Sequence, residues 1–161
     1  MNHSLSTPLD IRKFLTGHVV DVFGTMLSLS AVPVAGDVIP SFPERITGSV
    51  GFGGEKLNGA VYLHLSSPFA STATGIILGC TPADLGEVET NDVIGELTNM
   101  LAGGLKSALC DHGLPCAVST PAIIRGAYEI ETVPDVCREL LLFEADKNRF
   151  AVEIHVKFNP A

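Results

Sequence analysis

The sequence predicts an α+β domain in which long helices pack on a mainly antiparallel sheet. Two stretches place apolar residues three and four positions apart, which is the spacing of an amphipathic helix. Other stretches alternate apolar and polar residues, as in "GAVYLHLS" and "RFAVEIHVKF", and this indicates half-buried strands. Turn signals join the strands in pairs, which favours antiparallel pairing. The 161 residues are enough for one sizeable core, so we expect a single domain over residues 1–161.

The amino-terminal half contains two predicted helices and a hairpin. Residues 1–8 are expected to form a flexible tail, and Asp10 then begins a helical pattern that extends to about residue 29. A connector rich in proline and glycine, residues 33–43, precedes a hairpin formed by "RITGSVGF" and "GAVYLHLS". The segment "SPFASTATGIILG" then predicts a short helix capped by Ser67, because it begins with Ser-Pro and ends in Gly.

The second half repeats the order of a helix followed by strands. A polar connector leads to a long helix, from residue 91 to about 111, which Gly113 and Pro115 end. Three strands are predicted after it, over residues 116–126, 138–145 and 149–158, with a turn at residues 146–148. The predicted order is therefore helix, two strands, helix, helix and three strands.

The two halves also show a weak internal repeat. A shift of 82 residues aligns "KFLTGHVVDVFGTML" with "GELTNMLAGGLKSAL", and strands follow each helix. This predicts pseudo-symmetric helix–hairpin halves. Phe14 and Gly17 occupy the positions that Glu96 and Asn99 occupy in the second half, so only the second half carries polar side chains there.

Composition and charge exclude several classes of function. Hydrophobic residues make up 46% of the chain and charged residues 17%, which favours buried elements and a subunit interface. The formal net charge of −8, without a basic stripe, argues against a nucleic-acid partner. No apolar run reaches the ~20 residues that a membrane span needs. The first residues also lack the pattern of a signal peptide. We therefore expect a cytoplasmic protein without a membrane partner.

The cysteines and histidines do not predict a metal site. Cys110, His112 and Cys116 are close in sequence, but no fourth ligand lies near them. The four cysteines form no CxxC pair, so we expect reduced thiols. His64 and His155 fall within alternating strands and are expected on the surface of the sheet.

The long helix contains the most informative pattern, "DVIGELTNML". At 100° per residue, one side of this helix gathers polar and small residues within about 40° of a single direction. The opposite side is apolar. The residues on the polar side form a strip, which we call the α-helical strip: Asp92, Glu96, Asn99, Gly103 and Lys106.

A purely structural interpretation of the strip is that every amphipathic helix has a solvated face. A Glu and an Asn three apart are weak evidence alone, because Glu55 and Asn58 have the same spacing in a hairpin turn. Gly103 favours a function, because glycine costs roughly 1 kcal/mol against alanine in a helix. Core packing does not require it on this face, so Gly103 would let another macromolecule approach closely.

The segment "NDVIGELTNMLAGGLKSAL", followed by "VSTPAII", resembles the CheC/CheX/FliY family of chemotaxis phosphatases. Asp92, Glu96 and Asn99 match the first part of the family's motif, and Pro121 matches its downstream proline with one intervening residue fewer than usual. The motif occurs once, as in CheX, whereas CheC-like members carry it twice. The chain therefore most resembles CheX, and the resemblance implies a homodimer.

The resemblance implies a reaction and a partner. The substrate would be the aspartyl phosphate of a CheY-like receiver domain, with Asn99 positioning the attacking water and Glu96 pairing with a receiver lysine. Asp92, Gly103 and Lys106 would contact the partner, and Pro121 would have a structural role in the motif. The receiver would supply the Mg²⁺, so this chain is expected to bind no metal or other cofactor.

Two alternatives remain open from the sequence. A non-catalytic module with the same fold would bind a response regulator or a flagellar switch protein without hydrolysing phosphate. An enzyme using the histidines and cysteines on a small molecule or metal is the other alternative, but their spacing is not coherent. The rate at which a phosphorylated receiver loses phosphate, measured with the wild type and with Asn99→Ala, separates these possibilities.

Overall fold

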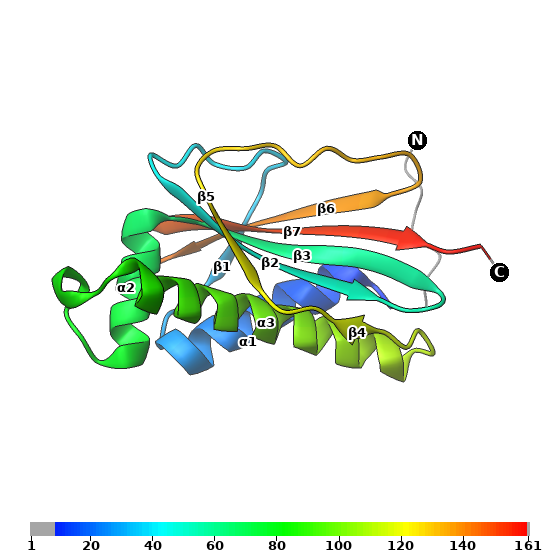
Figure 1. Cartoon of the computed structure of the whole chain (residues 1–161), viewed down its shortest axis with the longest axis horizontal. Helices are drawn as coiled ribbons and strands as arrows, with labels where there is room; N and C mark the ends of the chain where they lie inside the picture. The colour runs from blue at the N-terminus through cyan, green and yellow to red at the C-terminus, as the bar shows by residue number, and fades with distance from the viewer. Residues whose placement is uncertain (1–8, 161) are drawn as a thin grey trace.

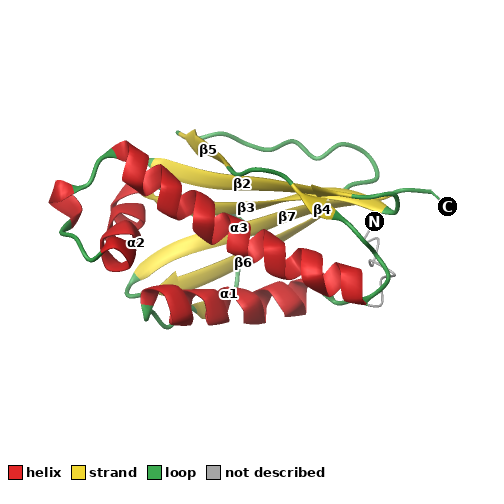
Figure 2. Ribbon diagram, turned by 60° about the horizontal axis from the view of Figure 1, so that its bottom comes forward, coloured by secondary structure: helices red, strands yellow, loops and turns green. Residues whose placement is uncertain are grey.

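The computed structural model describes residues 9–160 and shows a layered α+β fold. Two long helices, α1 (Ile11–Leu27) and α3 (Glu87–Asp111), lie on one face of a seven-stranded sheet (Figures 1 and 2). A shorter helix, α2 (Ser67–Leu78), and the 3₁₀ helix η1 (Pro82–Asp84) connect the central hairpin to α3. The predicted fold class is confirmed. In the described part of the chain, no helix is both long and apolar enough to cross a membrane.

All strand pairs in the sheet are antiparallel. The strand order is β1-β6-β7-β3-β2-β4, and β5 also pairs with β2. The strands are β1 (Val32–Val34), β2 (Arg45–Gly53), β3 (Leu57–Ser66), β4 (Ala117–Val118), β5 (Ala122–Arg125), β6 (Cys137–Ala145) and β7 (Asn148–Phe158).

The topology confirms the prediction of two pseudo-symmetric halves. The first half supplies α1 and strands β1, β2 and β3, and the second supplies α3 and strands β5, β6 and β7. Exchanging the halves converts the order β1-β6-β7-β3-β2-β5 into its own reverse. Equivalent positions also meet between the helices, because His18 of α1 forms a hydrogen bond with the carbonyl oxygen of Met100, 82 residues further on.

The helix boundaries follow local capping groups. The helical pattern was predicted to begin at Asp10, and Asp10 is the N-cap of α1, since its side chain accepts a hydrogen bond from the Lys13 amide. The predicted cap of α2 is wrong by one position. Ser66, not Ser67, is the N-cap, because the Ser66 hydroxyl oxygen accepts a hydrogen bond from the Phe69 amide.

Helix α3 begins earlier than the sequence predicted. Its N-cap is Gly86, whose amide donates to the Glu89 side chain at 3.0 Å. Acidic residues in a first helical turn are also favoured by the helix dipole. The segment from residue 87, predicted to be a polar connector, is therefore the first turn of the helix. The carboxyl-terminal end at Asp111 agrees with the prediction.

Two predictions for the strands need correction. The single strand expected over residues 116–126 is broken into β4 and β5. The break occurs at Ser119, which bonds to β2 partly through its side chain and not through its backbone alone. The Ser119 amide donates to the Gly51 carbonyl, and the Ser119 hydroxyl oxygen accepts from the Gly51 amide. The connector rich in proline and glycine also contains β1, a three-residue edge strand.

The core lies between the sheet and the helices. Aromatic rings from α1, α2, β6 and β7 meet there, with ring centroids 4.3 Å apart for Phe23 and Phe150 and 5.2 Å apart for Phe143 and Phe150. Helix α3 buries Ile94, Leu97, Leu101 and Leu105 into the same core. Burial of each such side chain stabilises the fold by roughly 1.5–3 kcal/mol.

Candidate functional site

The α-helical strip lies on the side of α3 opposite to its fully buried residues. Asp92 and Glu96 are exposed, whereas Asn99, Gly103 and Lys106 are half-buried. The structure therefore brings all five sequence-predicted residues of the strip to one helix face, at spacings of three and four.

The side chains of Asp92, Glu96 and Asn99 have no hydrogen-bond or ion-pair partner among the described residues. A polar side chain on a helix surface can pair with a neighbour three or four positions away. These three side chains instead leave their acceptors and donors free. They are available to a binding partner that approaches the outer surface of α3.

The two adjacent glycines of α3, Gly103 and Gly104, differ in whether packing leaves room for a side chain. A side chain at Gly104 would overlap the imidazole ring of His18, so close packing of α1 against α3 requires a glycine there. At Gly103, no atom beyond the neighbouring residues and the backbone of α3 itself lies within 4 Å of the place where a β-carbon would be. Internal packing therefore does not explain Gly103, as the sequence predicted.

Pro121 lies beside the strip although it belongs to the segment between β4 and β5. Its Cβ atom is 3.4 Å from the place where a β-carbon would be at Gly95, the residue before Glu96. The same segment continues into β5, where Ile123 also packs beside Gly95. Pro121 thus forms one wall of the strip, which fits the structural role that the motif implies.

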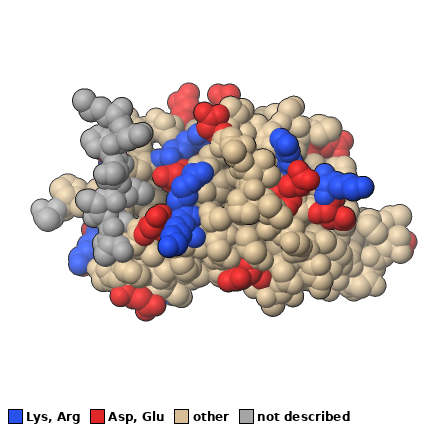
Figure 3. Space-filling view, turned by 180° about the vertical axis from the view of Figure 1, so that it is seen from behind, with Lys and Arg blue, Asp and Glu red and all other residues tan. Residues whose placement is uncertain are grey.

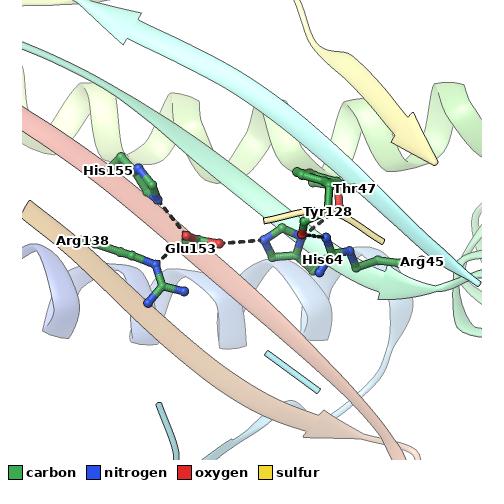
Figure 4. Close-up of polar contacts among 7 residues, drawn as sticks. All are labelled: Arg45, Thr47, His64, Tyr128, Arg138, Glu153 and His155. Carbon is green, nitrogen blue, oxygen red and sulfur yellow. Dashed lines mark hydrogen bonds and ion pairs between the residues drawn. The ribbon is translucent and has the colours of Figure 1, made fainter. Parts of the chain in front are cut away.

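A second polar cluster, missed by the sequence analysis, lies on the opposite face of the sheet (Figure 4). His64 and His155 were expected on the sheet surface, and this is wrong, because they are 0% and 8% exposed. Both donate to the carboxylate of Glu153, at 3.0 and 2.7 Å. Arg138 donates to the same carboxylate at 2.6 Å.

A segment distant in sequence explains this burial. The connection between β5 and β6, which Figure 1 shows running over the sheet away from α1 and α3, carries Tyr128. Arg45 donates to the carbonyl oxygen of Tyr128 and lies over its ring, 4.5 Å from the ring centroid. The Tyr128 ring in turn lies 6.3 Å from that of His64. Strand periodicity gives no signal of such a cover.

Burial and hydrogen bonding set the charges of this cluster. Burial alone would raise the pKa of Glu153, but hydrogen bonds from His155, His64 and Arg138, with the Arg138 charge, hold that pKa well below its ordinary value. Burial lowers the pKa of His64, and this outweighs its hydrogen bond to Glu153. Glu153 is therefore ionised and His64 neutral at neutral pH.

The Thr47 hydroxyl oxygen lies 2.8 Å from Nδ1 of His64, and His64 in turn bonds to Glu153. A hydroxyl, an imidazole and a carboxylate in this order also occur in some nucleophilic sites. Thr47 and His64 are completely buried, so no substrate reaches this hydroxyl. A cavity of about 860 Å³ lies next to the cluster, lined by Arg45, Tyr128 and Glu153 among others. The cluster thus joins β2, β3, β6 and β7 beneath the covering segment and has a structural role.

The described residues contain no group of three or more His, Cys, Asp or Glu side chains placed to hold a metal ion. All four cysteines are free thiols, in agreement with the sequence. On the side opposite to that of Figure 1, basic and acidic side chains are interspersed (Figure 3). The α-helical strip is therefore the best candidate for a functional site.

Comparisons with known proteins identify the family of the chain. A sequence model described as chemotaxis phosphatase CheX matches residues 46–144, more than half of the chain and a span that includes the strip and Pro121. No curated protein sequence matches the chain.

Solved structures share the fold. CheX from Vibrio vulnificus has a TM-score of 0.78 and 23% identity, over 92% of this chain and 97% of that chain. CheX from Desulfovibrio desulfuricans has a TM-score of 0.74 and 24% identity, over 92% and 100%. The CheX-CheY-BeF3-Mg complex from Borrelia burgdorferi gives a TM-score of 0.66 and 18% identity, over 92% and 98%. With the match of the family model, these findings show that the chain belongs to the family of the chemotaxis phosphatase CheX.

Proposed function

We propose that this chain is a cytoplasmic phosphatase that accelerates hydrolysis of the aspartyl phosphate on a CheY-like response regulator. The observation that supports this most is the pair Glu96 and Asn99, which lie on one open helix face without partners among the described residues. Membership of the CheX family supports the phosphatase reaction. A structural neighbour was solved in complex with CheY, beryllium fluoride and magnesium, which supports a receiver as partner.

The proposed mechanism depends on positioning. An acyl phosphate is already activated, so a water molecule held in line with the phosphorus atom removes much of the barrier. The Asn99 amide would hold this water beside the phosphoryl group. Glu96 would pair with a receiver lysine and orient the partner, and Asp92 would make an outer contact. Gly103 and Lys106 would contact the receiver further along α3.

The metal ion of the reaction would belong to the receiver. Carboxylates on the receiver would bind Mg²⁺, which stabilises charge on the phosphoryl group. No residue of this chain is assigned to the metal. We also propose that the chain forms a homodimer, and sedimentation or light scattering at several concentrations measures this directly.

The test follows phosphate release from phosphorylated CheY-like receivers. Asn99→Ala should abolish the acceleration while leaving receiver binding largely intact, because only the in-line water is lost. Glu96→Ala should weaken both binding and acceleration. The matched control is Asn58→Ala, since Asn58 follows Glu55 at the same spacing but lies in β3, where it pairs with Gly53, and not in the hairpin turn that the sequence predicted. Full activity of Asn99→Ala would contradict the mechanism.

A second candidate function is a binding module that recognises a receiver or a flagellar switch protein. It is favoured by the structural similarity to a FliM middle domain from Helicobacter pylori, with a TM-score of 0.62. This function predicts that the wild-type chain binds a phosphorylated receiver without increasing its rate of phosphate loss. The same assay therefore separates the two candidates.

A further inference from the structure

The surface around the strip contains an exposed apolar side chain that the motif does not use. Val88 lies in the first turn of α3, four residues before Asp92, and is 69% exposed. At 100° per residue its direction is about 40° from that of Asp92 and about 20° from that of Asn99, and it lies about 6 Å before Asp92 along the helix axis. The outward strip of α3 therefore begins with an apolar residue.

Neither packing nor helix formation explains a valine at this position. Its side chain is too exposed to stabilise the core, and a β-branched residue is a poorer helix former than alanine, leucine or glutamate. Single exposed apolar residues are common on protein surfaces. The position of Val88 on the outward side of α3, one turn before the strip, distinguishes it from the other exposed valines.

A cation is fixed beside the same end of the strip. Arg125, at the end of β5, donates from Nη2 to the Oδ1 atom of Asn91 at 2.7 Å. Asn91 precedes Asp92, so this bond holds an exposed guanidinium group next to the strip. Within the described part of the chain, Arg125 has no other hydrogen-bond or ion-pair partner.

The hydrogen bond to Asn91 leaves Arg125 able to bind an acidic group of a partner. A guanidinium group has five N–H donors, and a neutral amide oxygen leaves its charge uncompensated. The packing of Pro121 and Ile123 beside Gly95 also fixes the path of β5 along α3. Arg125 is therefore oriented before any partner binds, which lowers the entropic cost of a contact with an acidic group.

We propose that Val88 and Arg125 form the recognition end of the receiver-docking surface. Val88 would meet an apolar side chain, and Arg125 an acidic side chain, on the receiver surface next to its phosphorylation site. This proposal rests on the proposed function, because it extends the same docking surface beyond Asp92. Val88 and Arg125 do not touch the reacting atoms in this scheme, and they determine which receiver binds and how tightly.

A structural role gives a different expectation for Arg125. Its hydrogen bond to Asn91 joins β5 to α3, so loss of the bond would lower the unfolding temperature without changing the affinity for a receiver. The recognition role predicts the opposite result. Loss of the guanidinium group would weaken receiver binding in variants that unfold at the wild-type temperature.

The experiment measures the affinity for a CheY-like receiver treated with beryllium fluoride and Mg²⁺, together with kcat and KM for phosphate release. We expect Val88→Asp and Arg125→Glu each to weaken binding and raise KM by about tenfold. At saturating receiver, kcat should stay within about twofold of the wild type. The matched controls are Val133→Asp and Arg149→Glu, because both side chains are also exposed but lie away from α3. Both controls should bind like the wild type.

A second substitution at Arg125 separates the effect of its charge on receiver binding from the effect of its hydrogen bond on stability. Arg125→Gln keeps a side chain that can bond to Asn91, so it should retain stability and still lose affinity. Unchanged affinity in Val88→Asp and Arg125→Gln would overturn the proposal, as would equal losses in the controls. Failure of the proposed function is distinguishable, because then the wild type itself would not accelerate phosphate release. Binding of the beryllium-fluoride-treated receiver would still report on Val88 and Arg125.

Discussion

The side chain of Thr98 in α3 packs directly against Gly48 of β2. A β-carbon at Gly48 would overlap the Thr98 hydroxyl group, and it would also lie 3.3 Å from Cγ2 of Ile94. The Thr98 hydroxyl is held in turn by donation to the Ile94 carbonyl oxygen at 2.7 Å. Because Asn99 follows Thr98, the contact with β2 fixes the height and rotation of the helical turn that carries the proposed water-binding amide.

Gly48→Ala should therefore destabilise the fold and misplace Asn99. The added methyl group overfills a closely packed interface, so we expect the free energy of unfolding to fall by about 1–3 kcal/mol. Receiver dephosphorylation should slow in the fraction that remains folded. Urea denaturation and phosphate release measure the two effects. Gly51→Ala is the control on the same strand, because its β-carbon would lie no closer than 3.4 Å to another residue. Equal stability of Gly48→Ala and the wild type would contradict the close packing of Thr98 against Gly48.

Gly103 and Gly104 offer a matched pair for separating function from packing. Gly103→Ala should stabilise the helix by up to about 1 kcal/mol, because alanine has the higher helix propensity and the position is open. The same variant should weaken receiver binding if the partner approaches closely at Gly103. Gly104→Ala should lower stability, because its methyl group would overlap His18. Thermal denaturation and receiver titration measure both effects, and a stabilised Gly103→Ala that binds normally would exclude Gly103 from the docking surface.

Acidification should destabilise the protein through the buried cluster. Because the pKa of His64 is lowered in the folded state, the unfolded chain binds a proton that the folded chain does not when pH falls below about 6.5. The stabilising contribution of Glu153, whose folded pKa is depressed, is present above about pH 4.3 and decreases below it. One such proton changes the free energy of unfolding by at most about 1.4 kcal/mol per pH unit.

The free energy of unfolding, measured between pH 7.5 and 5, tests this effect for His64. The wild type should lose stability over this range, and His64→Gln should show a smaller dependence on pH. His112→Gln, which changes an exposed histidine at the end of α3, should keep the wild-type dependence. An unchanged pH dependence in His64→Gln would show that another group is responsible.

The strip was predictable from sequence because its geometry is local. The spacing of Asp92, Glu96 and Asn99 alone places them on one face once the segment is helical, and the apolar residues between them show which side is buried. The alternating pattern of the last two strands and the turn between them were local for the same reason. The roles of these residues in catalysis stay predictions, since the structure gives their positions and not their chemistry.

The features that the sequence analysis missed depend on contacts between distant segments. The burial of His64 and His155 comes from Tyr128 and the segment around it, which strand periodicity does not reveal. The break between β4 and β5 results from the pairing of Ser119 with Gly51, 68 residues away. Strand β1 is too short, and too rich in proline, to give a strand signal of its own.

Pro121→Ala should show whether the downstream proline supports the strip. Pro121 packs beside Gly95 and restricts the backbone before β5, so its loss removes a contact and gives the unfolded chain more freedom. We expect a loss of about 0.4–1 kcal/mol in stability. We also expect slower dephosphorylation, because the wall next to Glu96 becomes mobile. Thr120→Ala is the control, since Thr120 is exposed in the same connection. If Pro121→Ala lowered stability but kept full phosphatase activity, Pro121 would serve the fold without positioning the strip.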